Sequence, residues 1–183
     1  VDVEDNYFDE GCLLPPRNNE WPATLEIADE LSTRGMRGTF FFKVYEREFW
    51  ADPEYFDYVV KETRRLGHEV GLHTHPHRSS FYNKQLDEYN LAEQERVIRY
   101  GKKVLEELLQ EDVASFRAGG YRHNNDTITA LSNLGFLADS SVLFPFHLNA
   151  TSCSKYVLPH SVGNLTEVPI SPVIVAGKHG SFR

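Results

Sequence analysis

The sequence predicts an α/β fold, in which helices alternate with the strands of a largely parallel sheet. One pattern occurs three times: an amphipathic segment ends in Gly and a short apolar segment follows, as in "LSTRGMRGTFFFKV", "TRRLGHEVGLH" and "LSNLGFLADSSV". The continuous apolar runs "TFFF" and "EVPI" are typical of strands that are covered on both faces. Two architectures fit these observations, an open doubly wound sheet and a barrel.

The helices are predicted from their ends. Gly adopts the left-handed conformation at low cost directly after a helix, so a glycine there marks a helix end. Three glycines hold this position: Gly35, Gly67 and Gly135. Asp52 followed by Pro53 is typical of a helix start, and Asn90 with Glu93 predicts a capping box. We expect helices near residues 22–34, 53–66, 90–110 and 125–134.

The strands are predicted from the apolar segments between these helices. We expect them near residues 1–4, 38–44, 68–73, 113–117, 136–141 and 166–171. In both α/β architectures the active site forms at the C-terminal edge of the sheet, where the strands end. Charged and imidazole side chains gather at that edge: Asp2, Glu4, Asp5, His73, His77, Arg117 and Asp139.

Composition limits the number of domains and the classes of partner. With 183 residues and 40% hydrophobic content, the chain is expected to form a single domain over residues 1–183. Its net charge of -8, with Lys and Arg spread along the sequence, disfavours nucleic acid and acidic membranes as partners. No apolar run is long enough to span a bilayer, and the absence of a signal peptide favours a soluble cytoplasmic protein. The missing initiator Met predicts a trimmed chain.

The stretch "HEVGLHTHPH", from His68 to His77, holds four of the eight histidines. His73 closes a predicted strand, and Pro76 breaks regular helix, so His77 is expected one turn into the loop, where both imidazoles can face one ion. Two imidazoles and a carboxylate from "VDVED" are the ligands of a catalytic divalent ion, with zinc as the expected metal. We expect His68 at the turn from helix to strand and His75 facing solvent.

The segments "VDVED", "HTHPH", "FRAGGY" and "ADSSV", in this order, resemble the motifs of the polysaccharide deacetylase family, the NodB homology domain of carbohydrate esterase family four. The resemblance spans nearly the whole chain. "HTHPH" fits the family's His-Ser/Thr-x-x-His metal motif, with Thr74 in the Ser/Thr place. The resemblance implies a distorted (β/α) barrel of about six to seven parallel strands and metal-dependent removal of N-acetyl or O-acetyl groups from carbohydrate.

The resemblance also implies roles for single residues. Asp2 maps onto the catalytic base of the first motif, and either Glu4 or Asp5 is the carboxylate ligand. Alternation along a strand places Asp2 and Glu4 on one face, which favours Glu4. Arg117 begins the third motif, where it would keep Asp2 ionised and oriented; an ordinary salt bridge is the competing interpretation.

Other residues of the predicted edge are assigned to the substrate or to the leaving group. Backbone N–H groups around Gly120 and Tyr121 are candidates for an oxyanion hole. Five aromatic residues in the predicted loops either stack on a sugar ring or pack the loops onto the barrel, and Tyr121 is the one assigned to the substrate: Tyr7, Phe8, Tyr121, Phe144 and Phe146. Asp139 either orients the histidine that acts as general acid or caps a turn with Ser140.

The chain departs from the family pattern at several points. The first motif reads "DVED" without the usual adjacent aspartates and Gly, "RAGGY" lacks the usual proline, and the fourth motif lacks its Trp. The general acid is open among four possibilities: His147, His160, which follows Leu158 in a Leu-x-His pattern, His179, and a residue beyond Arg183, which would make the chain truncated at its C-terminal end too.

Two other functions therefore compete with carbohydrate deacetylation. One is hydrolysis of a different C–N bond, such as that of a cyclic amide or ureide, on the same fold. The presence of both His73 and His77 argues against it, because such relatives often lose metal ligands. The other is a non-catalytic, carbohydrate-binding descendant, which loss of the general acid would favour. The sequence does not choose the sugar, the type of acetyl linkage or the oligomeric state.

Overall fold

The computed structural model describes residues 1–3, 23–44, 53–76, 82–143 and 158–170. The elements follow the chain in this order: β1 (Asp2–Val3), α1 (Ala23–Thr33), β2 (Thr39–Lys43), α2 (Pro53–Arg65), β3 (Glu69–Thr74), η3 (Leu86–Glu88), α3 (Leu91–Leu109), β4 (Ser115–Ala118), η4 (Gly119–Tyr121), α4 (Asn125–Asn133), β5 (Ala138–Asp139), β6 (His160–Val162) and β7 (Leu165–Glu167). Strands and helices alternate up to β5, so the predicted α/β class is confirmed.

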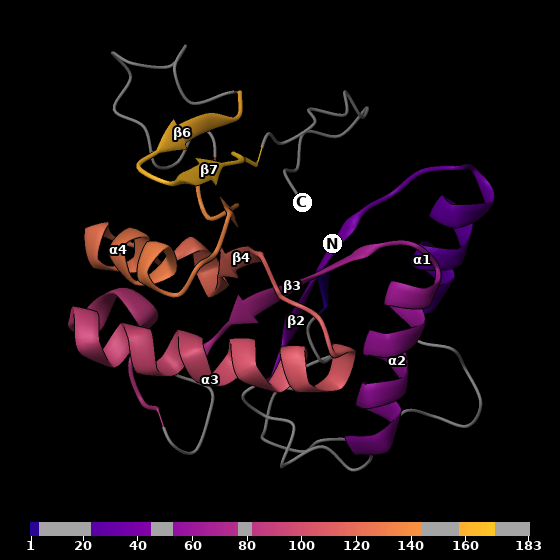
Figure 1. Cartoon of the computed structure of the whole chain (residues 1–183), viewed down its shortest axis with the longest axis horizontal. Coiled ribbons are helices and arrows are strands. Elements are labelled where there is room, and N and C mark those ends of the chain that lie inside the picture. Colours follow the sequence, from indigo (N-terminus) through magenta and orange to yellow (C-terminus); the bar gives the residue numbers. More distant parts are fainter. Residues whose placement is uncertain (4–22, 45–52, 77–81, 144–157, 171–183) are drawn as a thin grey trace, which may run out of the picture.

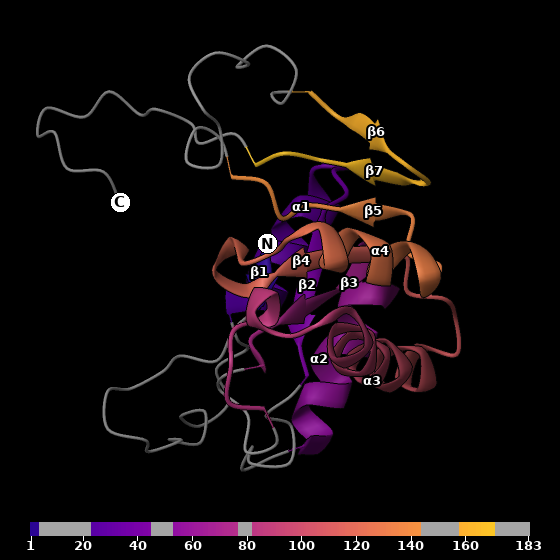
Figure 2. The same cartoon turned by 90° about the vertical axis from the view of Figure 1, so that its left-hand side faces the viewer.

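The strands form one seven-stranded sheet in the order β1-β2-β3-β4-β5-β7-β6. Every neighbouring pair is parallel except β6 with β7. From β1 to β5 each strand lies beside the one that precedes it along the chain, and Figure 2 shows β5, β7 and β6 following one another beyond β4. A doubly wound sheet reverses its strand order at a switch point, whereas a barrel keeps the order sequential. The observed order therefore agrees with the barrel-like expectation.

The helices end where the sequence predicts. Their predicted ends all lie within one residue of the observed ends of α1, α2, α3 and α4. The Asn90 side chain accepts a hydrogen bond from the Glu93 backbone N–H, and the Glu93 carboxylate accepts one from the Asn90 N–H, so α3 begins with the expected capping box. The glycines that follow α1, α2 and α4 have positive φ angles, which stop each helix and turn the chain back towards the sheet: Gly35, Gly67 and Gly135.

The hydrophobic core lies between the sheet and the helices. Phe42, Leu72 and Phe116 are in register on β2, β3 and β4, and all three belong to the core cluster, in which buried residues of α1 to α4 pack against them. Figure 1 shows α2, α3 and α4 arranged around these strands. Successive residues of a strand point to opposite faces, so the residue that follows each of these three faces away from the helices.

The sheet departs from the sequence expectation at β6. This strand was not predicted, because three residues, "HSV", carry neither an apolar run nor a clear alternation. It forms an antiparallel hairpin with β7, and the strand expected at residues 166–171 is shorter and begins one residue earlier, at Leu165. Within the described ranges, no helix is long and apolar enough to cross a membrane.

Candidate active site

The residues that face away from the helices form a polar row at the ends of the central strands. Lys43, His73 and Arg117 are in register on β2, β3 and β4 and directly follow the three core residues. Lys43 is 0% exposed and His73 is 1% exposed, so both polar side chains are held inside the protein. Sequence reasoning missed Lys43, although a Lys that closes the apolar run "TFFFK" is the signal that could have found it.

Arg117 connects this row to the first strand. Its Nη1 donates a hydrogen bond to Asp2 Oδ1 at 2.5 Å, and the two side chains are only 14% and 26% exposed. Its Nε donates to the Ser140 carbonyl at 3.0 Å, and its Nη2 donates to Ser140 Oγ at 2.9 Å. The guanidinium also lies over the Phe41 ring, 4.2 Å from its centroid. Arg117 is therefore fixed on three sides, which fixes the Asp2 carboxylate at the same edge as His73.

His73 is held in one tautomer. Its Nδ1 lies 2.9 Å from the carbonyl oxygen of Arg117, and because a carbonyl only accepts, Nδ1 must carry the proton. The lone pair of the neutral ring is then on Nε2, the arrangement that metal-binding histidines commonly use. The backbone of Arg117 thus orients His73 while its side chain orients Asp2.

The expectation that His75 faces solvent is wrong. Its side chain is 6% exposed, and its ring lies edge-on to His73, with the ring centroids 4.8 Å apart at an interplanar angle of 81°. The cause is the turn that follows β4, because Gly119 packs directly against His75. This contact joins residues 44 positions apart along the chain, so local sequence pattern does not predict it.

The turn from Gly119 to Tyr121 owes its shape to two glycines. A Cβ on Gly119 would lie 2.2 Å from the Thr74 carbonyl oxygen and 2.5 Å from the His75 ring, so only Gly fits there. Gly120 has a φ of 58°, and Tyr121 follows with a φ of 57°. A positive φ is uncommon in a non-glycine residue and costs about 1 kcal/mol or more. The "RAGGY" segment is therefore a tightly constrained loop beside His75.

Replacing Gly119 with Ala should destabilise the protein by more than about 2 kcal/mol, because the added methyl group overlaps backbone as well as side-chain atoms. Gly120→Ala is the matched control: its φ of +58° carries a cost of about 1 kcal/mol, but among the described residues the only atom within 4 Å of an added Cβ is Arg122 Cγ at 3.6 Å. Urea denaturation of both variants measures the difference. Equal losses of stability would show that the close packing against His75 is absent in solution.

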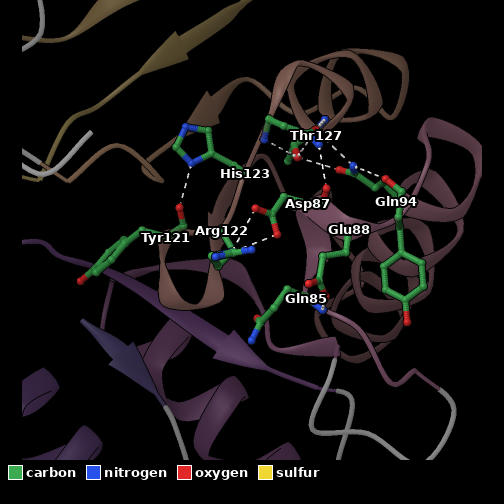
Figure 3. Close-up of polar contacts among 10 residues, drawn as sticks. Gln85, Asp87, Glu88, Gln94, Tyr121, Arg122, His123 and Thr127 are labelled. Carbon is green, nitrogen blue, oxygen red and sulfur yellow. Dashed lines mark hydrogen bonds and ion pairs between the residues drawn. The ribbon is translucent and has the colours of Figure 1, made fainter. Parts of the chain in front are cut away.

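A polar network joins this turn to η3, α3 and the start of α4 (Figure 3). The Arg122 Nε donates to Asp87 at 3.0 Å, and His123 Nδ1 donates to the Tyr121 carbonyl at 3.1 Å. Gln94 accepts a hydrogen bond from the Thr127 hydroxyl at the start of α4. Figure 3 shows the Tyr121 ring extending away from this network. These hydrogen bonds connect the turn with η3, α3 and α4, and the Tyr121 side chain lies outside this network.

Asp139 lies beside a second buried carboxyl group that sequence reasoning missed. Asp139 and Glu167 are in register on β5 and β7, and they are 1% and 3% exposed. Asp139 Oδ1 accepts a hydrogen bond from Ser141 Oγ at 2.5 Å, and Glu167 Oε1 accepts one from the Val142 N–H at 3.2 Å. Burial, together with the neighbouring Asp139 charge, raises the pKa of Glu167 to about 9, and burial also raises the pKa of Asp139. Glu167 is therefore uncharged at neutral pH.

The Glu167 proton makes stability depend on pH. The pKa of Glu167 is about 9 in the folded protein against an ordinary 4.5, so folding takes up a proton between these values and the free energy of unfolding falls as pH rises through them. Glu167→Gln, which keeps a neutral side chain, should show a smaller fall in thermal midpoint between about pH 6 and about pH 8.5 than the unsubstituted protein. Glu107→Gln, at an exposed glutamate of α3, should not differ from the unsubstituted protein. Identical pH profiles for all three proteins would contradict a protonated Glu167.

Several predicted site residues lie outside the described part of the chain: Glu4, Asp5, His77, His147 and His179. His160 is described, as the first residue of β6. It lies opposite Glu167 of β7 in the strand register, and its Nδ1 donates to the Leu158 carbonyl at 3.1 Å. Within the described ranges, no group of three or more His, Cys, Asp or Glu side chains is arranged to hold a metal ion. The described residues still fit one in chemistry, since His73 donates its Nδ1–H to a backbone carbonyl, as metal-binding histidines commonly do.

The chain matches the family model described as Polysaccharide deacetylase over residues 7–138. The matched range contains His73, His77 and Arg117 and begins after Asp2. No curated protein matches the chain.

Solved structures share its fold. A protein from Mycobacterium smegmatis assigned to the polysaccharide deacetylases is 22% identical, with a TM-score of 0.60 over 81% of this chain and 45% of that one. A family 4 carbohydrate esterase from Streptomyces lividans, solved with acetate, is 14% identical, with a TM-score of 0.52 over 66% of this chain and 56% of that one. A family 4 pseudoenzyme from Bacillus anthracis is 14% identical, with a TM-score of 0.50 over 62% of this chain and 36% of that one. The chain thus spans about half the length of these structures or less.

Proposed function

Because the chain belongs to the polysaccharide deacetylase family, we propose that it is a metal-dependent hydrolase that removes acetyl groups from an N-acetylated or O-acetylated carbohydrate. The observation that carries the proposal is the pairing of Asp2 with Arg117 at the sheet edge where His73 lies. These residues come from three different strands, and they supply a carboxylate base, a fixed cation and an oriented imidazole.

We infer the ligand set from the described donor and the family motif together. His73 would bind through Nε2, while His77 and one carboxylate, Glu4 or Asp5, would complete the set. Zinc is the ion that this mixture of nitrogen and oxygen donors favours. A divalent ion bound there supplies an acidified water molecule and polarises the acetyl carbonyl.

The protein's own residues carry out the proton transfers. Asp2 would take the proton of the attacking water, and Arg117 would hold the Asp2 carboxylate in the correct orientation through the 2.5 Å hydrogen bond. Backbone N–H groups of the Gly120–Tyr121 turn are candidates to stabilise the oxyanion, because the turn is anchored and a glycine permits close approach. The Tyr121 ring, which extends away from the polar network around the turn, is the candidate for contact with a sugar.

We infer the candidate for protonation of the leaving group from the register of the strands β5, β7 and β6. Asp139 adjoins Glu167, and Glu167 is paired across the hairpin with His160, so His160 is the candidate acid that the described residues favour. Asp139 would then contribute to the electrostatics of that acid through Glu167. His147 and His179 remain the alternatives outside the described ranges.

Acetate release from a panel of N-acetylated and O-acetylated oligosaccharides tests the proposed function. We expect the zinc-loaded protein to release acetate from at least one of them, and a chelator to stop the reaction until zinc is restored. Turnover of a cyclic amide or ureide without acetate release would favour a different C–N hydrolase. Saturable sugar binding without turnover of any substrate would identify a non-catalytic carbohydrate-binding protein.

A further inference from the structure

We propose that Glu167 is a positioning residue for the proposed reaction, because it holds the chain segment that fixes Arg117 and, through Arg117, the Asp2 carboxylate. This segment comprises residues 139–142, which begin at the last residue of β5, and we call it the β5 exit segment. Glu167 lies on β7, outside the four motif segments of the sequence. Its effect on turnover rests on the proposed function, whereas its effect on the Arg117 side chain can be measured without substrate or metal.

The β5 exit segment holds Arg117 and the backbone that follows it. Arg117 Nε donates to the Ser140 carbonyl at 3.0 Å, and Arg117 Nη2 donates to Ser140 Oγ at 2.9 Å. The Ala118 N–H donates to Ser141 Oγ at 2.9 Å. Arg117 Nη1 donates to Asp2, so the direction of the guanidinium at that carboxylate depends on where the two serines lie. A shift of this segment would therefore displace the proposed base without touching it.

Glu167 and the residue after it hold the same segment from the side of β7. Glu167 Oε1 accepts a hydrogen bond from the Val142 N–H at 3.2 Å. The Ser140 hydroxyl donates to the Val168 carbonyl at 2.7 Å, and the Val168 N–H donates to the Asp139 carbonyl at 2.7 Å. Because its proton points to β7, the Ser140 hydroxyl presents only its lone pairs to β4, where they accept the hydrogen bond of the arginine.

Glu167 also supplies a hydrogen-bond donor to the Asp139 carboxylate. Asp139 is 1% exposed, and its Oδ1 accepts a hydrogen bond from Ser141 Oγ at 2.5 Å. Its Oδ2 is buried and, within the described ranges, receives no hydrogen bond from an N–H or a hydroxyl group. Burial raises the pKa of both carboxyl groups, and the hydrogen bond between their side chains lowers that of Asp139 and raises that of Glu167. Glu167 is therefore the protonated partner, which donates while Asp139 accepts.

Other groups that can carry a positive charge adjoin this pair among the described residues: Arg117 of β4, His123 of the turn before α4, and His160, which lies opposite Glu167 on β6. Burial outweighs their effect on the pKa of either carboxyl group. Loss of the Glu167 proton would leave two adjacent buried carboxylates, which would repel each other and compete with Asp2 for the charge of Arg117. The neutral form of Glu167 is therefore the form that positions the base.

Two substitutions at position 167 test this role in the metal-free protein. Glu167→Gln keeps a neutral group that can donate and accept hydrogen bonds, whereas Glu167→Met keeps the length of the side chain and can do neither. Exchange of the Arg117 Nε–H with water at about pH 7, followed by NMR, should be unchanged in Glu167→Gln and about 10-fold or more faster in Glu167→Met. The Arg64 Nε–H, an ion-pair donor on α2, is the internal control and should exchange at the same rate in all three proteins.

Turnover provides a second readout. Glu167→Met should lower kcat for acetate release by about 10–100-fold with KM and zinc content unchanged, because a small displacement of a catalytic group has an effect of this order. Glu167→Gln should keep its kcat at about pH 7. Since the pKa of Glu167 is about 9, the kcat of the unsubstituted protein relative to that of Glu167→Gln should fall about 10-fold between about pH 8 and about pH 10. Glu107→Gln, at an exposed glutamate of α3, should follow the unsubstituted protein at every pH.

The outcomes separate the inference from the proposed function. If Glu167→Met matches Glu167→Gln in kcat, the inference is wrong and the deacetylase proposal stands, whether or not the Arg117 exchange rate changes. If none of the proteins releases acetate from any oligosaccharide, the proposed function fails, and the exchange rates alone decide whether Glu167 positions Arg117. If Glu167→Met does not fold, the comparison of the unsubstituted protein with Glu167→Gln decides: a relative fall in kcat above about pH 9 supports the inference, and parallel pH profiles overturn it.

Discussion

Replacing Asp2 with Asn should cut turnover by about 10²–10⁴-fold while metal content stays near that of the unsubstituted protein, because this is the usual contribution of a positioned base. Asn keeps the shape of Asp, and its amide oxygen still accepts the hydrogen bond that Arg117 Nη1 donates to Asp2. The amide cannot, however, take a proton from water. Initial rates of acetate release and metal analysis of the same preparation measure the two effects.

Glu111→Gln is the control for loss of a carboxylate that pairs with an arginine elsewhere. Glu111 accepts a hydrogen bond from Arg64 Nε at 2.6 Å, outside the proposed site, so its loss should change turnover little. Loss of metal together with activity in Asp2→Asn would instead make Asp2 a ligand, and it would shift the assignment of the first motif by one place.

Replacing His73 and His77 together with Ala should abolish stoichiometric metal binding and with it all turnover. The reason is that the double variant removes both imidazole ligands of the proposed site, His73 and its partner in the family motif. Metal content after loading with zinc and removal of free ions measures the effect. His123→Ala is the control, since it removes an imidazole from the neighbouring turn. Full metal content in the double variant would exclude the site.

The helices could be predicted closely because their ends have local causes. A glycine after α1, α2 and α4 and a capping box at α3 act within a few residues, so sequence placed all four helices. The prediction that His68 lies at the turn from a helix to a strand is also confirmed, since it lies between α2 and β3. Its Nδ1 accepts a hydrogen bond from the Gly38 N–H, and its Nε2 donates to the Ala28 carbonyl, which ties the turn before β3 to α1.

The candidate site was only partly accessible to sequence reasoning. The rule that parallel strands carry function at their C-terminal edge brought Asp2, His73 and Arg117 together, and the structure places them there. It gave no information on which side chains become covered by a neighbouring turn, and this is why His75 was expected in solvent.

Glu167 was missed for a different reason. A glutamate inside an apolar run is normally assigned to the solvent side of a strand, and its burial became visible only when β7 paired with β5. That pairing brings Asp139 and Glu167, which are 28 positions apart in the sequence, into register. It depends on which strand becomes the neighbour of β5 in the sheet. Such pairing is set by the tertiary fold and not by local pattern.

Acetate release measured while zinc is titrated into metal-free protein is the most direct test of the central claim, which is metal-dependent deacetylation at the edge formed by Asp2, His73 and Arg117. We expect turnover to rise in proportion to bound zinc and to level off when each chain holds a single ion. Turnover in the metal-free protein equal to that of the zinc-loaded protein would contradict the claim. So would a full complement of bound zinc with no acetate released from any N-acetylated or O-acetylated oligosaccharide.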